Sequence, residues 1–125
     1  MSSLEDWRPA IFDQLTIKVP EMSTVHVLAF ITTHPGQRDT VLELFNANLP
    51  AVLAEDGCIA YEATIDTPGA EPIQMPVGPD TFVVVEKWAS LDHLRAHAAS
   101  GHMKTYGERT KDMVADRAIH VLSAV

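Results

Sequence analysis

The stretch from Phe82 to Tyr106, FVVVEKWASLDHLRAHAASGHMKTY, decides the fold that we predict for this chain. Its first part is a short valine-rich run that leads to Ser90, a residue type that often caps the N-terminus of a helix. After Ser90, apolar residues recur at helical spacing until Ser100-Gly101 interrupts them, and the pattern then resumes. The stretch therefore predicts a buried strand followed directly by a broken helix.

The rest of the chain supplies one more helix and three more strands. We expect strands over residues 25–33, 58–67 and 117–125, a helix that ends near Asp56-Gly57, and a proline-rich loop over residues 68–80. Pro50 falls inside this helix, where we expect it to kink or split the helix and to free the carbonyl of Asn46.

The order β-α-β-β-α-β predicts a ferredoxin-like α+β sandwich over residues 23–125, preceded by an N-terminal arm over residues 1–22. We expect the arm to lie across its own domain or a neighbouring subunit. An antiparallel sheet of this kind usually leaves one face in water, yet the strands here are apolar on both faces. Val83 and Val85, for example, point opposite to Phe82 and Val84. A second copy of the sheet is the simplest cover, so we predict a homodimer.

Composition excludes several classes of partner. The chain has 9 basic and 17 acidic residues, a formal net charge of -8, which disfavours nucleic acids and anionic membranes. No apolar run is long enough to cross a bilayer, and the first residues do not resemble a signal peptide. The single cysteine, Cys58, cannot form an internal disulfide. We therefore expect a cytoplasmic protein.

Several short motifs, in their order and spacing, resemble the antibiotic biosynthesis monooxygenase domain family over about residues 24–125. They are His34-Pro35-Gly36, Glu55-Asp56-Gly57-Cys58, Tyr61-Glu62, Glu86-Lys87-Trp88, His97 and Ser100-Gly101-His102-Met103. The small members of this family include quinol monooxygenases. The resemblance implies a dimeric α+β barrel, in which two ferredoxin-like sheets pack face to face.

The family covers several activities, so the resemblance must be weighed by residue. Its members include cofactor-free oxygenases of anthrones and quinols, haem-degrading enzymes, and isomerases of small signalling molecules. The positions that haem-degrading relatives use hold different residues here, namely Ala29, His97 and Gly107. Trp88 matches a pocket residue of the anthrone oxygenases, but their pocket Asn and Tyr fall on Val84 and Leu94. The two histidines His97 and His102 fit the quinol-oxygenase and isomerase branches better.

We predict that His97 and His102 are catalytic. A histidine near neutral pKa can take the phenolic proton of a quinol, and the resulting electron-rich anion can pass an electron to oxygen without metal or flavin. His102 is expected to orient His97 or to bind a substrate oxygen. The alternative is structural: His97 could bond a backbone carbonyl, and His102 could only fix the helix break.

Four further residues are predicted to bind the substrate: Trp88, Glu86, Phe82 and Tyr106. Trp88 and Phe82 would form an apolar wall, and Trp88 could at the same time be a core residue that packs the sheet against the helices. Glu86 shares the face of Trp88, so it needs a buried partner, for which a helix N-terminus, an arginine or a histidine is expected. Tyr106 could donate a hydrogen bond in the pocket or only pack in the core.

We predict no metal and no cofactor. His93 and His97 are spaced i, i+4, as zinc ligands can be, but no glutamate lies between them and Gly101 is expected to turn His102 away. The predicted function is a cofactor-independent monooxygenase that uses molecular oxygen and a small quinol or related aromatic. The alternatives are an isomerase of a small hydroxy-carbonyl compound and a non-catalytic dimeric ligand-binding module.

Overall fold

A computed structural model describes residues 23–125, and the predicted arm over residues 1–22 lies outside this part of the chain. Four strands and three helices follow one another in the order β-α-β-β-α-α-β. Their bounds are β1 Val25–Thr33, α2 Arg38–Leu53, β2 Cys58–Thr64, β3 Thr81–Trp88, α3 Leu91–Ala98, α4 Gly101–Thr110 and β4 Val114–Leu122. No helix within residues 23–125 is both long and apolar enough to span a membrane.

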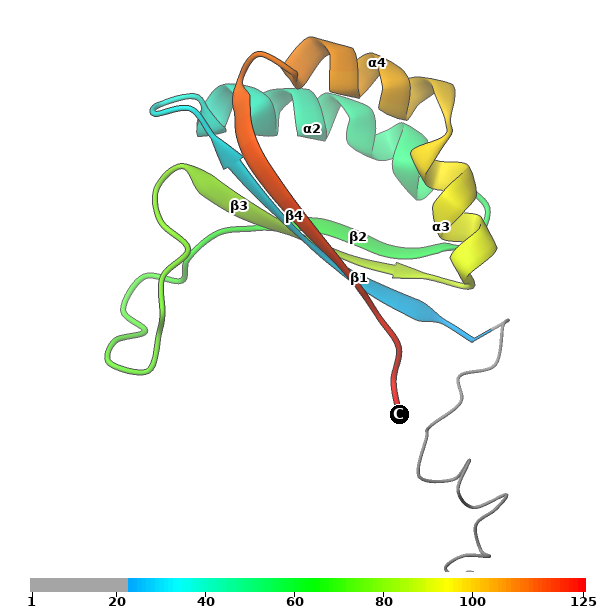
Figure 1. Ribbon diagram of the computed structural model, residues 1–125, viewed down its shortest axis with the longest axis horizontal. Coiled ribbons are helices and arrows are strands. Elements are labelled where there is room, and N and C mark those ends of the chain that lie inside the picture. The colour runs from blue at the N-terminus through cyan, green and yellow to red at the C-terminus, as the bar shows by residue number, and fades with distance from the viewer. Residues whose placement is uncertain (1–22) are drawn as a thin grey trace, which may run out of the picture.

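The four strands form one antiparallel sheet in the order β2-β3-β1-β4. The three helices lie together on one face of this sheet, and the other face carries no helix (Figure 1). This arrangement confirms the predicted ferredoxin-like α+β fold. We call the helix-free side the outer face; its centre is formed by Leu28, Phe30, Val83 and Val85, which are paired across β1 and β3.

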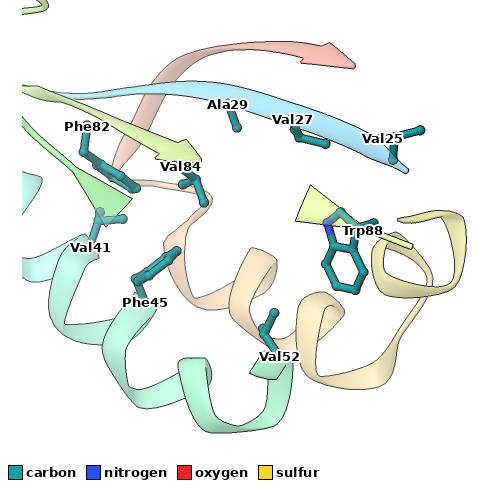
Figure 2. Packing of buried hydrophobic residues seen from close by; sticks show 9 residues of the cluster. All are labelled: Val25, Val27, Ala29, Val41, Phe45, Val52, Phe82, Val84 and Trp88. Carbon is teal, nitrogen blue, oxygen red and sulfur yellow. The ribbon is translucent and has the colours of Figure 1, made fainter. Parts of the chain in front are cut away.

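The core lies between the helices and the sheet. Figure 2 shows Val27 and Ala29 of β1 facing Val41 and Phe45 of α2. On β3, Phe82 and Trp88 are both fully buried, as the alternation along the strand predicted. Aromatic rings continue this packing: Phe45 stacks on Tyr61 at a centroid distance of 5.4 Å and meets Phe82 edge-on at 6.2 Å.

Three predicted boundaries were wrong. Strand β2 ends at Thr64 rather than Thr67, because the Asp66 side chain turns to accept hydrogen bonds from the backbone N–H groups of Val77 and Gly78. Strand β4 runs from Val114 to Leu122, since an irregularity at Thr32/Thr33 lets it pair earlier with β1.

Pro50 does not split the first helix. Helix α2 continues through it to Leu53, and the last turn carries Val52 into the core, where it is fully buried. Pro50 lies within the final turn of α2 and removes one backbone hydrogen bond. The burial of Val52 offsets this loss.

The predicted break between two helices is confirmed, and a serine caps each half. The Ser90 hydroxyl accepts a hydrogen bond from the backbone N–H of His93 at 3.2 Å. The Ser100 hydroxyl accepts from the backbone N–H of Met103 at 3.3 Å and also donates to the His97 carbonyl at 2.8 Å. Ser100 therefore ties the end of α3 to the start of α4.

Gly57 gives a prediction about stability. Its φ is +80°, and a Cβ at this position would lie 2.3 Å from ring atoms of His93. We expect Gly57→Ala to lose about 1–2 kcal/mol from the left-handed backbone and about 1–3 kcal/mol more from the clash. Gly36→Ala is the matched control, since Gly36 has φ +79° and a Cβ added there would meet nothing within 4 Å. Urea unfolding of both variants checks this; equal losses would show that His93 moves aside freely.

Candidate functional site

A cavity of about 420 Å³ lies between the helices and the sheet. Its walls are mostly apolar, and its polar lining residues are few. The lining includes Val27, Ala29, Ile31, Phe45, Tyr61, Val84, Glu86, Leu94, His97, Ala98, Met103, Tyr106, Gly107, Thr110, Val114, Arg117 and Ile119. An apolar cavity of this size with a few convergent polar groups is typical of a site for a small organic ligand.

A single carboxylate oxygen joins two histidines beside this cavity. Oε2 of Glu55 lies 2.8 Å from Nδ1 of His97 and 2.7 Å from Nε2 of His102. His97 is buried, with 4 % of its surface exposed, and the Glu55 side chain is only 13 % exposed. Because a carboxylate only accepts hydrogen bonds, each imidazole donates from the named nitrogen. In the neutral form of the His97 ring, whose Nδ1 then carries the proton, Nε2 is an acceptor.

The break between α3 and α4 makes this convergence possible. His97 and His102 are five residues apart, so on one continuous helix their side chains would point about 140° away from each other. Residues 99 and 100 interrupt the helix, and the Ser100 hydroxyl lies 3.3 Å from Nε2 of His102. The expectation that Gly101 would turn His102 away from His97 was therefore wrong, because both rings reach the same oxygen.

Two aromatic rings hold the His97 ring in place. Trp88 lies beside it at a centroid distance of 4.6 Å, and Tyr61 meets it edge-on at 5.3 Å. Trp88 is fully buried, so it packs against the ring from within the core. The orientation of His97 thus depends on contacts with β2 and β3 as well as on Glu55.

Glu86 is a second acidic group in the cavity lining. It is 6 % exposed, and its Oε1 accepts a hydrogen bond from the Trp88 indole N–H at 2.9 Å. The predicted partner classes were wrong, since an indole rather than an arginine, histidine or helix N-terminus provides this bond. Burial raises the pKa of Glu86, and the indole hydrogen bond and the nearby His97 only partly oppose this rise.

Two tyrosines also line the cavity and can donate hydrogen bonds. Burial and the neighbouring Glu86 raise the pKa of Tyr61 far above its ordinary value. Burial likewise raises the pKa of Tyr106 to about 12, while the positive charge of Arg117 opposes the rise. Both phenols therefore stay protonated at neutral pH.

The predicted site residues are only partly brought together. His97, Glu86 and Tyr106 line the cavity. His102 reaches Glu55 instead and, with Tyr106, lines a smaller hollow of about 210 Å³ between α2 and α4. Trp88 and Phe82 are fully buried and are not among the cavity-lining residues, so they do not form the apolar wall that we expected. Trp88 instead contacts two lining residues, His97 and Glu86.

Glu55 was missed as a site residue, although it lies in one of the family motifs. It follows α2 and is 42 residues from His97, so no helical or strand periodicity connects the two. The available signal was its position beside Asp56-Gly57, a turn that stops the helix and directs the chain back toward the sheet.

The same three side chains form the group that could hold a metal ion. Single ligand atoms of Glu55, His97 and His102 all lie within 4.8 Å of one another. Two histidines and a carboxylate are a donor set that suits zinc and similar divalent ions. The pair that the sequence suggested does not form, since His93 bonds Ser90 and Asp56. That the protein works without a metal remains a prediction.

The raised pKa of Glu86 predicts a pH-dependent stability. The folded protein binds this proton more tightly than the unfolded chain does, so ionisation destabilises the fold above the raised pKa. Below the ordinary value of 4.5 the carboxyl group is protonated in both states and the penalty disappears. Glu86→Gln should therefore raise the free energy of unfolding at pH 7 by on the order of 1 kcal/mol, with a smaller gain as the pH falls toward 4.5.

Urea unfolding at several pH values measures this effect. Glu43→Gln, on an exposed position of α2, is the matched control and should show no such trend. A Glu86→Gln protein that is less stable than the wild type at pH 7 would contradict the prediction.

Comparison with known proteins places the chain among proteins with this architecture. Residues 24–109 match the family model of the antibiotic biosynthesis monooxygenases. The Escherichia coli K12 protein named "Probable quinol monooxygenase YgiN" is 40% identical over 98 residues, which cover 77% of this chain and 93% of that protein.

Solved structures agree on the fold. Rv0793 from Mycobacterium tuberculosis has a TM-score of 0.67 at 25% identity, covering 82% of this chain and 96% of that one. PA3566 from Pseudomonas aeruginosa has a TM-score of 0.70 at 19% identity, covering 86% and 99%. The family match and the Escherichia coli relative lead to one assignment, with which the helix-covered sheet agrees: this chain belongs to the antibiotic biosynthesis monooxygenase family.

Proposed function

We propose that the protein is a cofactor-independent monooxygenase of a small quinol or a related electron-rich aromatic. One observation carries the proposal: a buried histidine lines an apolar cavity, and a carboxylate fixes its tautomer. The family match and the quinol monooxygenase named among the relatives support the reaction class. The substrates are the quinol and molecular oxygen.

His97 acts as the general base in this proposal. Its Nε2 takes a phenolic proton while Nδ1 donates to Glu55, so the carboxylate stabilises the imidazolium that forms. The substrate anion passes one electron to oxygen, and the two radicals combine to form a carbon–oxygen bond. The His97 imidazolium returns its proton to the resulting peroxide, and loss of water then gives a hydroxyquinone, so quinol plus O₂ yields hydroxyquinone plus H₂O. The apolar walls favour an aromatic ring and limit the access of water.

The other predicted residues assist in different ways. His102 is a positioning residue, because it contacts the same Glu55 oxygen that His97 contacts. Glu86 and Tyr106 line the cavity and bind the oxygens of the substrate by hydrogen bonds. Trp88 supports both His97 and Glu86 from the core, and Phe82 packs behind Phe45, a lining residue.

The two alternative functions receive less support. An isomerase would use the same histidines to move protons without oxygen, so turnover under anaerobic conditions would identify it. A non-catalytic module would be favoured by a site filled with side chains, whereas the structure has a cavity of about 420 Å³. The matched family and the named relative are both described as monooxygenases.

Oxygen uptake with a panel of quinols and anthrones tests the proposed activity. With metal-stripped and flavin-free protein, uptake should saturate with substrate and exceed the autoxidation blank. His97→Ala and Glu55→Gln should each lower kcat between about 100-fold and 10,000-fold, the usual contribution of a general base. His93→Ala is the matched control, since His93 lies one turn earlier on α3 and does not line the cavity.

Full uptake in His97→Ala protein that is folded by circular dichroism would remove His97 from the mechanism. Uptake that disappears after metal stripping and returns with one divalent ion would overturn the cofactor-independent mechanism. Uptake at the blank rate with every substrate would reject quinol and anthrone oxygenation.

We further propose that the protein is a homodimer formed through the outer face. Leu28, Phe30 and Val83 are half-buried, and Val85 is 39 % exposed, so apolar side chains remain in contact with water at the centre of the sheet. A second copy of the same face would cover them by two-fold symmetry. Two twisted sheets of this kind can pack face to face with their strand directions nearly aligned.

The outer face can be tested by a charged substitution. Val85→Glu should convert the dimer into a monomer, because each interface would bury two uncompensated carboxylates. Sedimentation equilibrium of the full chain measures the mass. Leu53→Glu is the control, since Leu53 is 52 % exposed at the end of α2 and lies away from the outer face. A wild-type protein that is monomeric at micromolar concentration would refute the proposal.

A further inference from the structure

The two polar ends of the cavity are separated along the strands. Glu86 pairs with Val27 on β1, and Arg117 of β4 pairs with Ile31 on the same strand. Val27 and Ile31 are four residues apart, which corresponds to about 13 Å along a strand. All four residues line the cavity, so its acidic group and its arginine lie at opposite ends.

The end with Glu86 also holds the proposed base. His97 is near enough to Glu86 to affect its ionisation, and both side chains contact Trp88. His97 and Glu86, which can accept or share protons, therefore lie at the same end of the cavity. Under the proposed function, the reacting hydroxyl of the substrate binds here.

The end with Arg117 offers a positive charge that the described chain does not neutralise. Within residues 23–125, the Arg117 guanidinium forms no ion pair and no hydrogen bond. Arg117 is exposed, and Tyr106, which also lines the cavity, lies close enough for the positive charge of Arg117 to affect its ionisation. A guanidinium and a phenol together are donors that suit a planar oxyanion.

The space between the two ends is apolar. The level between Glu86 and Arg117 is lined by Ala29 and by its strand partners Val84 and Ile119. Phe45 of α2 also lines the cavity. These side chains suit a ring system and offer no donor or acceptor to a polar linker. The protein as a whole carries a net charge of -8, which repels anions in general. Any preference for an anionic ligand must therefore come from the local charge of Arg117.

From this layout we infer that the natural substrate is an aromatic that carries a carboxylate on the side opposite its reacting hydroxyl, and that Arg117 binds this carboxylate. The placement of the reacting hydroxyl rests on the proposed function. The selection of an anionic substituent by Arg117 does not, because it depends on the cavity and its charge alone.

Isothermal titration calorimetry with two matched quinones tests the inference. Quinones are already oxidised, so binding is measured without turnover. The probes are a naphthoquinone with a short carboxyalkyl chain and the corresponding neutral primary amide. The wild-type protein should bind the acid about 10- to 100-fold more tightly than the amide, the usual gain from a charge-assisted contact. Arg117→Met should abolish this preference, and Arg117→Lys should retain only part of it, since lysine lacks the planar fork.

Arg109→Met is the matched control, because Arg109 lines the smaller hollow rather than the main cavity. It should leave the preference for the acid unchanged. Equal affinity of the wild type for acid and amide would overturn the inference, as would a preference that survives in folded Arg117→Met protein. A clear acid preference without oxygen uptake on any quinol, including the reduced acid, would support the inference and count against the proposed oxygenase.

Discussion

The site depends on one oxygen atom. Oε2 of Glu55 accepts hydrogen bonds from His97 and His102 at 2.8 and 2.7 Å, and no other described contact joins the α2–β2 turn to both halves of the broken helix. Each of these two bonds fixes which imidazole nitrogen carries its proton. The chemistry available at His97 is therefore set by a residue outside the helix that carries it. A substitution that kept both histidines but moved the α2–β2 turn would leave them without the Glu55 hydrogen bonds that orient their rings.

The core supports the same geometry from the other side. Phe45, Tyr61, Trp88 and His97 form a continuous series of ring contacts from α2 through β2 and β3 to α3. The packing that stabilises the domain thus also orients the proposed base, and Phe45, Tyr61 and His97 of this series line the cavity. Glu86 is held by the same indole that contacts His97, so the two ionisable groups of the site share one rigid neighbour.

The fold could be predicted from the sequence because its signals are local. Alternation placed Phe82, Val84, Glu86 and Trp88 on one face, and Ser90 and Ser100-Gly101 marked the two helix starts. The site could be predicted only in part, since histidines in a helix are visible but their partner is not. Glu55 is 42 residues from His97, and Arg117 lies on a strand whose start was misplaced by three residues. Trp88 could either line the cavity or pack against the residues that line it. The choice depends on three-dimensional packing, which the periodicity of the sequence does not show.

The Glu55 contacts join residues that are far apart in the sequence, and this determines when the site forms during folding. Glu55 belongs to the first βαβ half and the histidines to the second, and their bonds join residues 42 and 47 positions apart. Such contacts form after local helices and hairpins, because a long loop must first be closed. The proposed base therefore acquires its tautomer only when the two halves have docked. A nascent or partly folded chain exposes its aromatic residues without a working site, so activity would report complete assembly rather than the mere presence of secondary structure.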